Sequence, residues 1–196
     1  MTDNESFFDR QAPDWDAQLL PHYYSVASKI LERGRLSASD RVLDVGCGTG
    51  ILIPQILALG ISRENITAID KSSGMAKAFA AKFPAVKILV DDFERRLFKE
   101  NSFDAIIIYN AFPHFSNFDR VFDNAFYYLA QSGRLVVAHS LNRAALNRLH
   151  RAAGGEVEED ILPEVMEFAQ FYRLTGFVDV LVEDGEYFYS HGTKKN

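Results

Sequence analysis

The sequence predicts an α/β fold, in which helices cover both faces of a mostly parallel β-sheet. Apolar runs of strand length alternate with stretches of helical period along most of the chain. One of them, residues 105–109, is an apolar run too short for a helix and typical of a strand buried on both faces. Because each parallel crossover needs a helix to return the chain, the alternation predicts a parallel sheet.

The first half of the chain has clear element boundaries. Gly34 and Gly60 each follow an apolar helical pattern, as C-terminal caps do. Ser72 or Ser73 supplies an N-cap for a helix that Pro84 stops. The predicted elements are, in order, helix 23–32, strand 41–45, helix 51–59, strand 66–70, helix 75–83 and strand 86–90.

The second half continues the alternation and ends in a hairpin. Its predicted elements are strand 105–109, helix 119–130 with Gly133 behind it, strand 135–138, helix 141–151, helix 163–174 and strands 177–182 and 186–189. Asp184-Gly185 between the last two strands is a two-residue hairpin signal. The hairpin therefore adds an antiparallel strand at one edge, and residues 105–109 are expected at the centre.

Composition narrows the class of protein. The 196 residues are 47% hydrophobic with a net charge of −6, as expected for one domain spanning residues 1–196. Basic residues are scattered, so we expect a small-molecule partner and no nucleic acid. No run suits a signal peptide or a membrane span, which favours a cytoplasmic protein without a membrane partner. Cys47 is the only cysteine, so an intramolecular disulfide and a cysteine metal cluster are excluded.

The N-terminal residues 1–20 combine large aromatic and charged side chains without a clean period. They form either a disordered arm or a lid over a pocket. Phe7, Phe8 and Trp15 would be costly to expose on an arm, so a lid over the core of residues 21–196 is favoured.

The strongest functional signal is Gly46-x-Gly48-x-Gly50, which follows a buried strand and precedes an apolar helix pattern. Glycines there let the backbone pack against a ligand and direct helix N–H groups at it, although a turn without a ligand is the alternative. The spacing differs from the Gly-x-Gly-x-x-Gly of dinucleotide sites. Asp70, at the next strand tip, could accept two hydrogen bonds from a ribose diol or simply be solvated.

A third strand tip completes a nucleoside pocket. Asp91-Asp92-Phe93 follows strand 86–90, where a carboxylate can accept an exocyclic amine and an aromatic ring can cover a base. The carboxyl ends of parallel strands meet at one edge of a sheet. The three tips together describe an adenosine site.

These motifs resemble the class I S-adenosylmethionine-dependent methyltransferases. The residues that carry the likeness are Val42-Leu-Asp-Val-Gly-Cys-Gly-Thr-Gly50, Ile69-Asp70-Lys-Ser-Ser-Gly-Met75, Asp92-Phe93 and Asn101-Ser-Phe-Asp104. The resemblance spans residues 41–140. It implies a three-layer Rossmann-like seven-stranded sheet of order 3-2-1-4-5-7-6 with an antiparallel last strand.

The resemblance also implies the contacts of the cofactor S-adenosylmethionine. Asp44, Gly46, Gly48 and Gly50 would surround its methionine end. Asp70 would bind the ribose. The adenine would contact Met75, the backbone of Phe93, and Asp92 rather than Asp91. The other expected cofactor contacts are Cys47, Lys71 and Asn110.

The resemblance points to a small-molecule acceptor. Residues 8–16 resemble the N-terminal segment of quinone-precursor and biotin-pathway methyltransferases. Asn110-Ala-Phe-Pro113 departs from the Asn/Asp-Pro-Pro-Tyr/Phe loop of enzymes that methylate nucleic-acid amines. We therefore expect methyl transfer to an N, O, S or C nucleophile of a small metabolite. The alternatives are a non-catalytic sensor of the cofactor and, disfavoured by glycine spacing, a nicotinamide-dependent oxidoreductase.

His114 is the first candidate for a catalytic base, since its loop borders the methyl group in the family, although a loop histidine that merely packs is the alternative. The other expected catalytic residues are Asn110 and Tyr109. Candidate substrate contacts are His114, Phe115, His139, Arg143 and Asn147. Arg143, Asn147 and His150 form a polar helix face, which is either solvated surface or a clamp for a polar or anionic substrate.

Zinc held by His114, His139 and His150 is conceivable, but their spacing is no metal signature, so no metal is expected. The sequence leaves the oligomeric state and the identity of the acceptor open.

Overall fold

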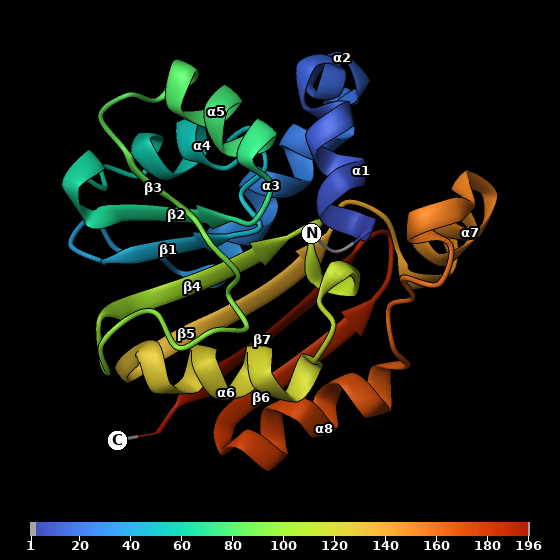
Figure 1. Cartoon of the computed structure of the whole chain (residues 1–196). Helices are drawn as coiled ribbons and strands as arrows, with labels where there is room; N and C mark the ends of the chain where they lie inside the picture. Colours follow the sequence, from blue (N-terminus) through green and yellow to red (C-terminus); the bar gives the residue numbers. More distant parts are fainter. Residues whose placement is uncertain (1–2, 196) are drawn as a thin grey trace.

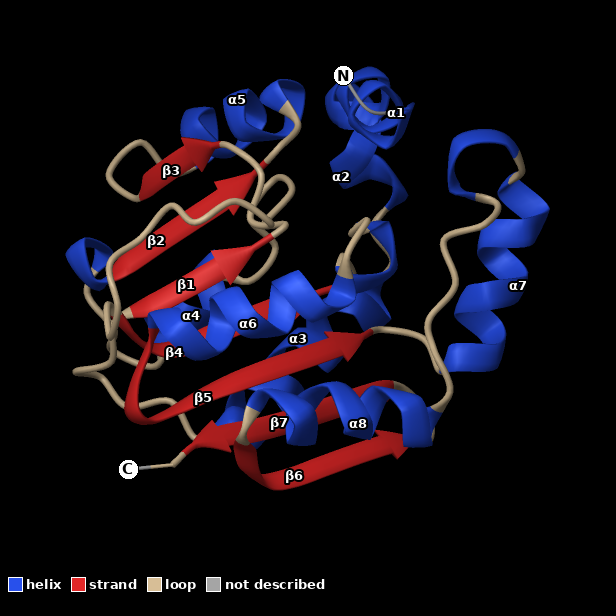
Figure 2. Cartoon of the chain, turned by 60° about the horizontal axis from the view of Figure 1, so that its bottom comes forward, coloured by secondary structure: helices blue, strands red, loops and turns tan. Residues whose placement is uncertain are grey.

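The computed structural model describes residues 3–195 as a seven-stranded sheet with helices on both faces (Figures 1 and 2). The strand order is β3-β2-β1-β4-β5-β7-β6, which confirms the expected order. The strands are β1 (Val42–Val45), β2 (Ile66–Asp70), β3 (Lys87–Val90), β4 (Phe103–Tyr109), β5 (Leu129–His139), β6 (Phe177–Asp184) and β7 (Phe188–Lys194). β7 is antiparallel to both neighbours, and it lies one place inside the edge that β6 forms.

Two apolar cores flank the sheet, because successive side chains of β4 point to opposite faces. Ile106 and Ile108 join the core beneath α6 (Phe118–Tyr128) and α8 (Val165–Thr175). Ile107 joins the other core, with α3 (Pro21–Gly34), α4 (Ile53–Ala58) and α5 (Ser73–Lys82). All three isoleucines are fully buried, so β4 is the central strand that its sequence predicts.

Most helix ends follow their local signals. Ser72 caps α5 by accepting a hydrogen bond from the Met75 N–H, 3.1 Å away. α7 (Arg143–Ala153) begins two residues later than expected, because the Asn142 side chain caps it through the Ala145 N–H. These caps satisfy N–H groups that the first turn of a helix leaves without partners.

The connection from α6 to β5 and the terminal hairpin differ most from the sequence prediction. The helix expected at residues 119–130 ends at Tyr128, and β5 starts at once at Leu129 and runs through Gly133. Pairing with β4 shifts its register there, with Ser132 in a left-handed conformation. The terminal hairpin has a loop of residues 185–187, not a two-residue turn, since Asp184 pairs with Phe188.

The carboxyl ends of β1, β2, β4 and β5 meet at one edge of the sheet (Figure 1). The N-terminal segment lies over that edge as α1 (Asp3–Gln11), the short helix η1 (Ala12–Asp14) and α2 (Trp15–Gln18). α7 lies beside this segment (Figure 1). No helix among residues 3–195 is both long and apolar enough to cross a bilayer.

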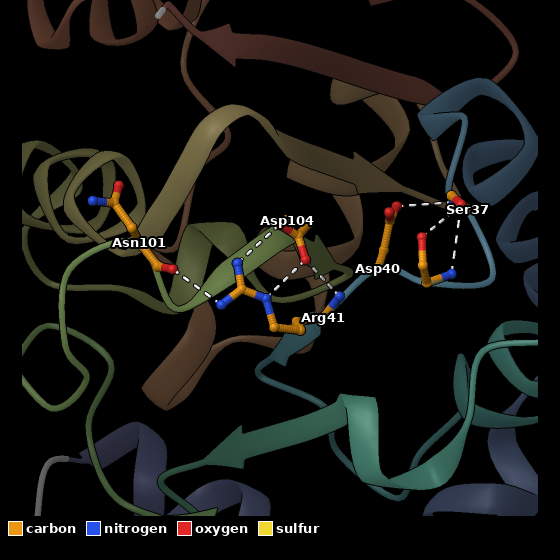
Figure 3. A network of polar contacts seen from close by, with 6 residues as sticks. Ser37, Asp40, Arg41, Asn101 and Asp104 are labelled. Carbon is orange, nitrogen blue, oxygen red and sulfur yellow. Dashed lines mark hydrogen bonds and ion pairs between the residues drawn. The ribbon is translucent and has the colours of Figure 1, made fainter.

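At the opposite edge, Arg41 ties the start of β1 to the start of β4 (Figure 3). The Asp104 carboxylate accepts from the Arg41 backbone N–H, Nε and Nη2, each at 2.9 Å. Nη1 of Arg41 donates to the Asn101 carbonyl oxygen at 3.1 Å. The hydrogen bonds from Arg41 lower the pKa of Asp104. The Asn101-Ser-Phe-Asp104 motif is therefore a structural clamp in this chain.

We predict that Asp104→Asn lowers the free energy of unfolding by about 1–2 kcal/mol, since the clamp is charge-assisted but partly exposed. A lowered carboxyl pKa stabilises the fold above the unfolded value of 3.8 and ceases to do so as the pH falls below it. Urea unfolding at pH 7 and at about pH 3 should therefore show a difference that shrinks in acid. Asp123→Asn, exposed on α6, is the matched control. A difference independent of pH would contradict the ionic clamp.

Candidate functional site

A pocket opens at the carboxyl ends of β1, β2 and β4, beneath the N-terminal segment, and is called here the strand-tip pocket. Its lining combines glycines, acids and large apolar side chains. The residues are Phe8, Trp15, Val45, Gly46, Gly48, Ile69, Asp70, Lys71, Met75, Asp91, Asp92, Phe93, Asn110, Ala111, His114 and Phe115. Eight of the eleven residues predicted to bind a cofactor are among them: Gly46, Gly48, Asp70, Lys71, Met75, Asp92, Phe93 and Asn110.

The glycine turn closes one wall of the pocket. All three glycines have positive φ, namely 64° at Gly46, 52° at Gly48 and 92° at Gly50. A Cβ on Gly46 would lie 2.5 Å from the Ala111 Cβ, so only glycine allows this turn to approach the end of β4. Gly50 does not line the pocket. Its missing Cβ makes room for the Phe83 ring, which places Gly50 in helix packing rather than at a ligand.

The N–H groups of the turn are bound within the protein. The Gly46 N–H donates to the Ile69 carbonyl at 2.9 Å, and the Gly48 N–H donates to Asp70 Oδ2 at 2.8 Å. These two backbone N–H groups of the turn are therefore not free to bind a ligand. Cys47 is buried and lies behind the pocket, where burial raises the pKa of its thiol well above the usual value.

Two carboxyl groups lie at the tips of β1 and β2, of which Asp44 is buried and Asp70 is half-buried. Asp70 accepts from the Gly48 and Ser72 N–H groups at 2.8 and 2.9 Å, yet burial still raises its pKa. Burial and the nearby Asp70 raise the pKa of Asp44 to about 8. Asp44 Oδ2 is buried without a hydrogen-bond partner, which costs free energy in the absence of a donor. The pair is therefore poised to receive hydrogen-bond donors from a ligand.

The far end of the pocket suits a flat ring. Met75 and Phe93 are buried, and both line the wall. Asp91 Oδ1 is already bound by the Asp92 N–H and by Arg95. Asp92 Oδ1 accepts only the Glu94 N–H among the contacts that the structure gives this side chain. This difference favours Asp92 over Asp91 as the acceptor for a ring amine.

The N-terminal segment is attached over the pocket by two carboxylates. Asp9 Oδ1 accepts from the Gly74 N–H at 2.8 Å and from the Ser72 hydroxyl at 2.6 Å, at the start of α5. Asp16 accepts from the Thr49 hydroxyl at 2.5 Å and pairs with Lys82 at 2.8 Å. These hydrogen bonds lower the pKa of both carboxyl groups. No sequence pattern marked either aspartate as an anchor.

A second cavity, called here the α7 cavity, adjoins the first. It lies between the N-terminal segment, the ends of β4 and β5, and α7. Its lining is Trp15, Leu19, Tyr23, Gly46, Cys47, Gly48, Thr49, Ile51, Tyr109, Asn110, His114, Ser140, Leu141, Leu146, Leu149 and His150. The two cavities share Trp15, Gly46, Gly48, Asn110 and His114. Their junction therefore includes Asn110 and His114, two of the three residues expected to be catalytic.

The predicted catalytic residues take different positions at this junction. His114, in the short helix η3 (Phe112–His114), pairs through Nδ1 with Asp160 Oδ2 at 2.7 Å. Asn110 has φ 56°, and its Oδ1 accepts the Ser140 N–H at 2.7 Å. The Tyr109 hydroxyl donates to the Tyr23 carbonyl at 2.7 Å, and burial raises its pKa. Tyr109 is therefore a wall of the cavity and poorly suited to act as a base.

Three of the predicted substrate contacts line neither cavity. Arg143 pairs with Glu164 at 2.7 Å and lies beside Asp184, so it does not clamp a substrate there. Asn147 is buried, and its side chain bonds both the N–H and the carbonyl of Leu162. His139 is fully buried, with neither ring nitrogen bonded. The solvated-surface alternative does not hold for Asn147 and His150, which are buried and hold residues 160–162 against α7. His150 also lines the α7 cavity.

Phe115 lines the strand-tip pocket and not the α7 cavity, with its ring centroid 6.3 Å from that of Phe93. His114 and His150 have ring centroids 5.1 Å apart. Within residues 3–195, however, no group of three His, Cys, Asp or Glu side chains is placed to hold a metal ion. The sequence patterns do not identify Asp160 as the partner of His114, because it ends a run of acidic residues typical of charged surface.

The fold and the strand-tip pocket are those of an α/β protein that binds a nucleoside. The glycine turn follows β1, where the strand order reverses between β1 and β4, and the acids follow the neighbouring strands. Residues 43–137 match the family model described as a methyltransferase domain. The malonyl-[acyl-carrier protein] O-methyltransferase of Bacillus cereus is 32% identical over 139 residues, 69% of this chain and 50% of that protein. The ubiquinone biosynthesis O-methyltransferase of Dechloromonas aromatica is 30% identical over 141 residues, 69% of this chain and 60% of that one.

A solved structure is similar over nearly the whole chain. It is a chain in the complex between the Haloferax volcanii Trm112 methyltransferase activator and a methyltransferase, with a TM-score of 0.80, 18% identity and coverage of 96% of this chain and 98% of that chain. This likeness shows the same fold. The chain belongs to the class I S-adenosylmethionine-dependent methyltransferases. It spans about half the length of the curated Bacillus relative.

The site fits the family's cofactor, S-adenosylmethionine, on observations of this chain alone. Asp44 lines neither cavity, but its unpartnered Oδ2 can accept a hydrogen bond from a water, which would in turn bridge to the cofactor's ammonium group. The Asp70 carboxylate keeps lone pairs for a diol beyond its two backbone bonds. Buried Met75 and Phe93 suit an adenine ring.

We predict that Asp44→Asn stabilises the ligand-free protein while weakening cofactor binding. Asp44 keeps its proton to about pH 8 when folded but loses it near 3.8 when unfolded. The free energy of unfolding therefore falls between those pH values, and an amide abolishes that loss. A gain of about 1–2 kcal/mol at pH 8 would raise Tm by about 2–8 °C. Thermal unfolding at pH 5 and pH 8 tests this, and a gain that does not grow with pH would contradict it.

Proposed function

We propose that this chain transfers the methyl group of S-adenosylmethionine to a small-molecule acceptor bound in the α7 cavity. The observation that carries the proposal is the junction of the two cavities at Gly46, Asn110 and His114. Methyl transfer from a sulfonium is an in-line displacement, which requires chiefly that nucleophile and methyl group be held in line. Two adjoining cavities with one shared wall supply that arrangement.

The residues divide into three roles in this proposal. Asp70 binds the ribose hydroxyls, Asp92 receives the adenine amine, and Asp44 with the glycine turn holds the methionine end. Asn110, fixed by its bond to the Ser140 N–H, forms the wall between cofactor and acceptor. His114 lies beside the acceptor. S-adenosylmethionine supplies an electrophilic methyl group when bound.

In this proposal residues 3–20 form a lid over both cavities, and the remaining described residues form the core that the lid covers. Phe8 has its ring centroid 4.9 Å from that of His114 and 5.7 Å from that of Trp15, so the lid covers the junction directly. The anchors Asp9 and Asp16 are side chains on an exposed segment, and hydrogen bonds of this kind can be released to admit a ligand.

A small metabolite in the cytoplasm is the acceptor that we infer. The curated relatives are named for malonyl-[acyl-carrier protein] and ubiquinone biosynthesis, which supports an acceptor other than nucleic acid. The complex that contains the Haloferax neighbour also includes a partner protein, the Trm112 activator. The oligomeric state of this chain is to be measured in solution. A cofactor sensor without turnover is the second candidate. Tight cofactor binding without product over a broad panel of nucleophiles would favour the sensor.

Calorimetry with S-adenosylhomocysteine tests the cofactor site. We expect Asp70→Ala to weaken binding by about 10–100-fold, because two hydrogen bonds to hydroxyls are lost at about 1–1.5 kcal/mol each. The contrasting variant is Asp91→Ala, which removes a neighbouring acid already bound to Arg95. Its affinity should change by less than about threefold. Absence of binding by the unmodified protein would sink the proposed function.

The lid has its own test in Asp9→Ala. Loss of the charge-assisted bonds to the start of α5 should weaken S-adenosylhomocysteine binding by about tenfold and speed hydrogen exchange in residues 3–18. Tm without ligand should barely move, since the anchor holds a terminal segment and not the core of the sheet. Asp14→Ala, in the same segment and exposed, is the control. Unchanged exchange in the Asp9 variant would show that the segment is fixed by other contacts and is no lid.

A further inference from the structure

We propose that Asp160 positions His114 as a base, and that the α7 cavity takes an uncharged, largely apolar acceptor that presents a hydroxyl group. The inference rests on the proposed methyltransferase function and adds the acceptor class and the proton route. Two independent features carry it, namely the pairing of His114 with Asp160 and the absence of full charges from the described lining of the α7 cavity.

The His114–Asp160 pair fixes which ring nitrogen is available. The Nδ1 to Oδ2 distance is 2.7 Å, and each side chain is only 17% exposed. A carboxylate accepts hydrogen bonds, so Nδ1–H donates to Asp160 and Nε2 is the ring nitrogen left for another partner. His114 lines both cavities, which places this ring where acceptor and methyl group meet. With its proton on Nδ1, the neutral tautomer of the ring can receive a proton at Nε2.

Helix α7 holds Asp160 in place. His150 donates from Nδ1 to the Asp160 backbone carbonyl, and burial lowers the pKa of His150, so its ring is neutral. Leu162 lies two residues after Asp160, and the Asn147 side chain of α7 bonds its backbone N–H at 2.9 Å and its carbonyl oxygen at 3.3 Å. Asp160 is thus fixed through its own backbone and through its neighbours. A fixed carboxylate orients the imidazole at little entropic cost during the reaction.

The α7 cavity selects against charged acceptors. Its described lining contains aromatic and aliphatic side chains, hydroxyls, an amide and imidazoles, but no carboxylate, ammonium or guanidinium group. An ionised carboxylate, phosphate or amine would lose its hydration there without a partner of opposite charge. A neutral hydroxyl can instead donate to a histidine nitrogen. It also needs a base, because the neutral oxygen is a weak nucleophile.

The proton and electron balance of the step is complete without a further reactant. A lone pair on the acceptor oxygen forms the bond to the methyl carbon, and the carbon–sulfur bond breaks with its pair going to sulfur. The hydroxyl proton passes to His114 Nε2. The imidazolium so formed is stabilised by the Asp160 carboxylate at Nδ1 and later releases the proton to water. The products are a methyl ether and S-adenosylhomocysteine.

The role of Asp160 is tested by nitrogen-15 NMR of the histidine rings, with His114→Gln used to assign His114. The unmodified protein should show His114 protonated at Nδ1 and not at Nε2 at neutral pH. In Asp160→Asn the amide can donate, so the tautomer should change and kcat should fall by about 10–100-fold with KM and cofactor Kd within threefold. Asp160→Glu should restore part of kcat. Glu159→Gln, an exposed neighbour in the same loop, is the control.

An Nε2-protonated ring in the unmodified protein would overturn the assignment, and this measurement needs no variant of Asp160 to fold. Equal kcat in the Asp160→Asn and control proteins would overturn it as well.

The acceptor class is tested by fluorescence of Trp15, the single tryptophan, which lines the α7 cavity. The probes are 2-naphthol, 2-naphthoate and 2-naphthylmethylamine, titrated in the presence of S-adenosylhomocysteine. We expect saturable quenching by 2-naphthol at an affinity at least tenfold above that of the two charged probes. Equal or tighter binding of a charged probe, or binding of none, would overturn the acceptor class. Cofactor calorimetry on the same sample separates this failure from failure of the proposed function.

Discussion

The close approach of the β1 tip to its two neighbours is the constraint on which the whole site depends. Gly46 is within reach of Ala111 on one side only because it lacks a Cβ, and its N–H bonds the Ile69 carbonyl on the other. The Asp70 carboxylate then receives the Gly48 N–H. Three strand tips are thereby held together by one backbone hydrogen bond, one hydrogen bond to the Asp70 carboxylate and the close contact with Ala111.

This edge is built at some cost to stability. Asp44 is buried and Asp70 half-buried, and desolvation raises the pKa of both, with the neighbouring carboxyl adding to the shift at Asp44. Buried acids without donors are unfavourable in the free protein and favourable once a ligand supplies donors. The lid uses carboxylates differently. Asp9 and Asp16 bind hydroxyl, backbone and lysine donors near the surface, and their pKa values are lowered.

Helix α7 shows how a polar helix face can be misread. Arg143, Asn147 and His150 share one face, and the sequence favoured either solvent or a substrate as their partner. They instead bond Glu164, Leu162 and Asp160, the segment that returns the chain to α8. Polar side chains of this helix face are used here to fix a loop without regular structure, since such a loop leaves backbone groups to be satisfied. His150 in addition lines the α7 cavity.

The sequence by itself determined the sheet, its order through the family motifs, and many of the residues that line the strand-tip pocket, because these follow from local patterns of strand, glycine and acid. It did not determine the β5 bulge near Gly133, the packing role of Gly50, or the partners of His114 and Arg143. Those depend on contacts between residues far apart in the chain. The Asp160 carboxylate reaches His114 across 46 residues. No local spacing encodes such a meeting, which only the folding of α7 over the sheet edge brings about.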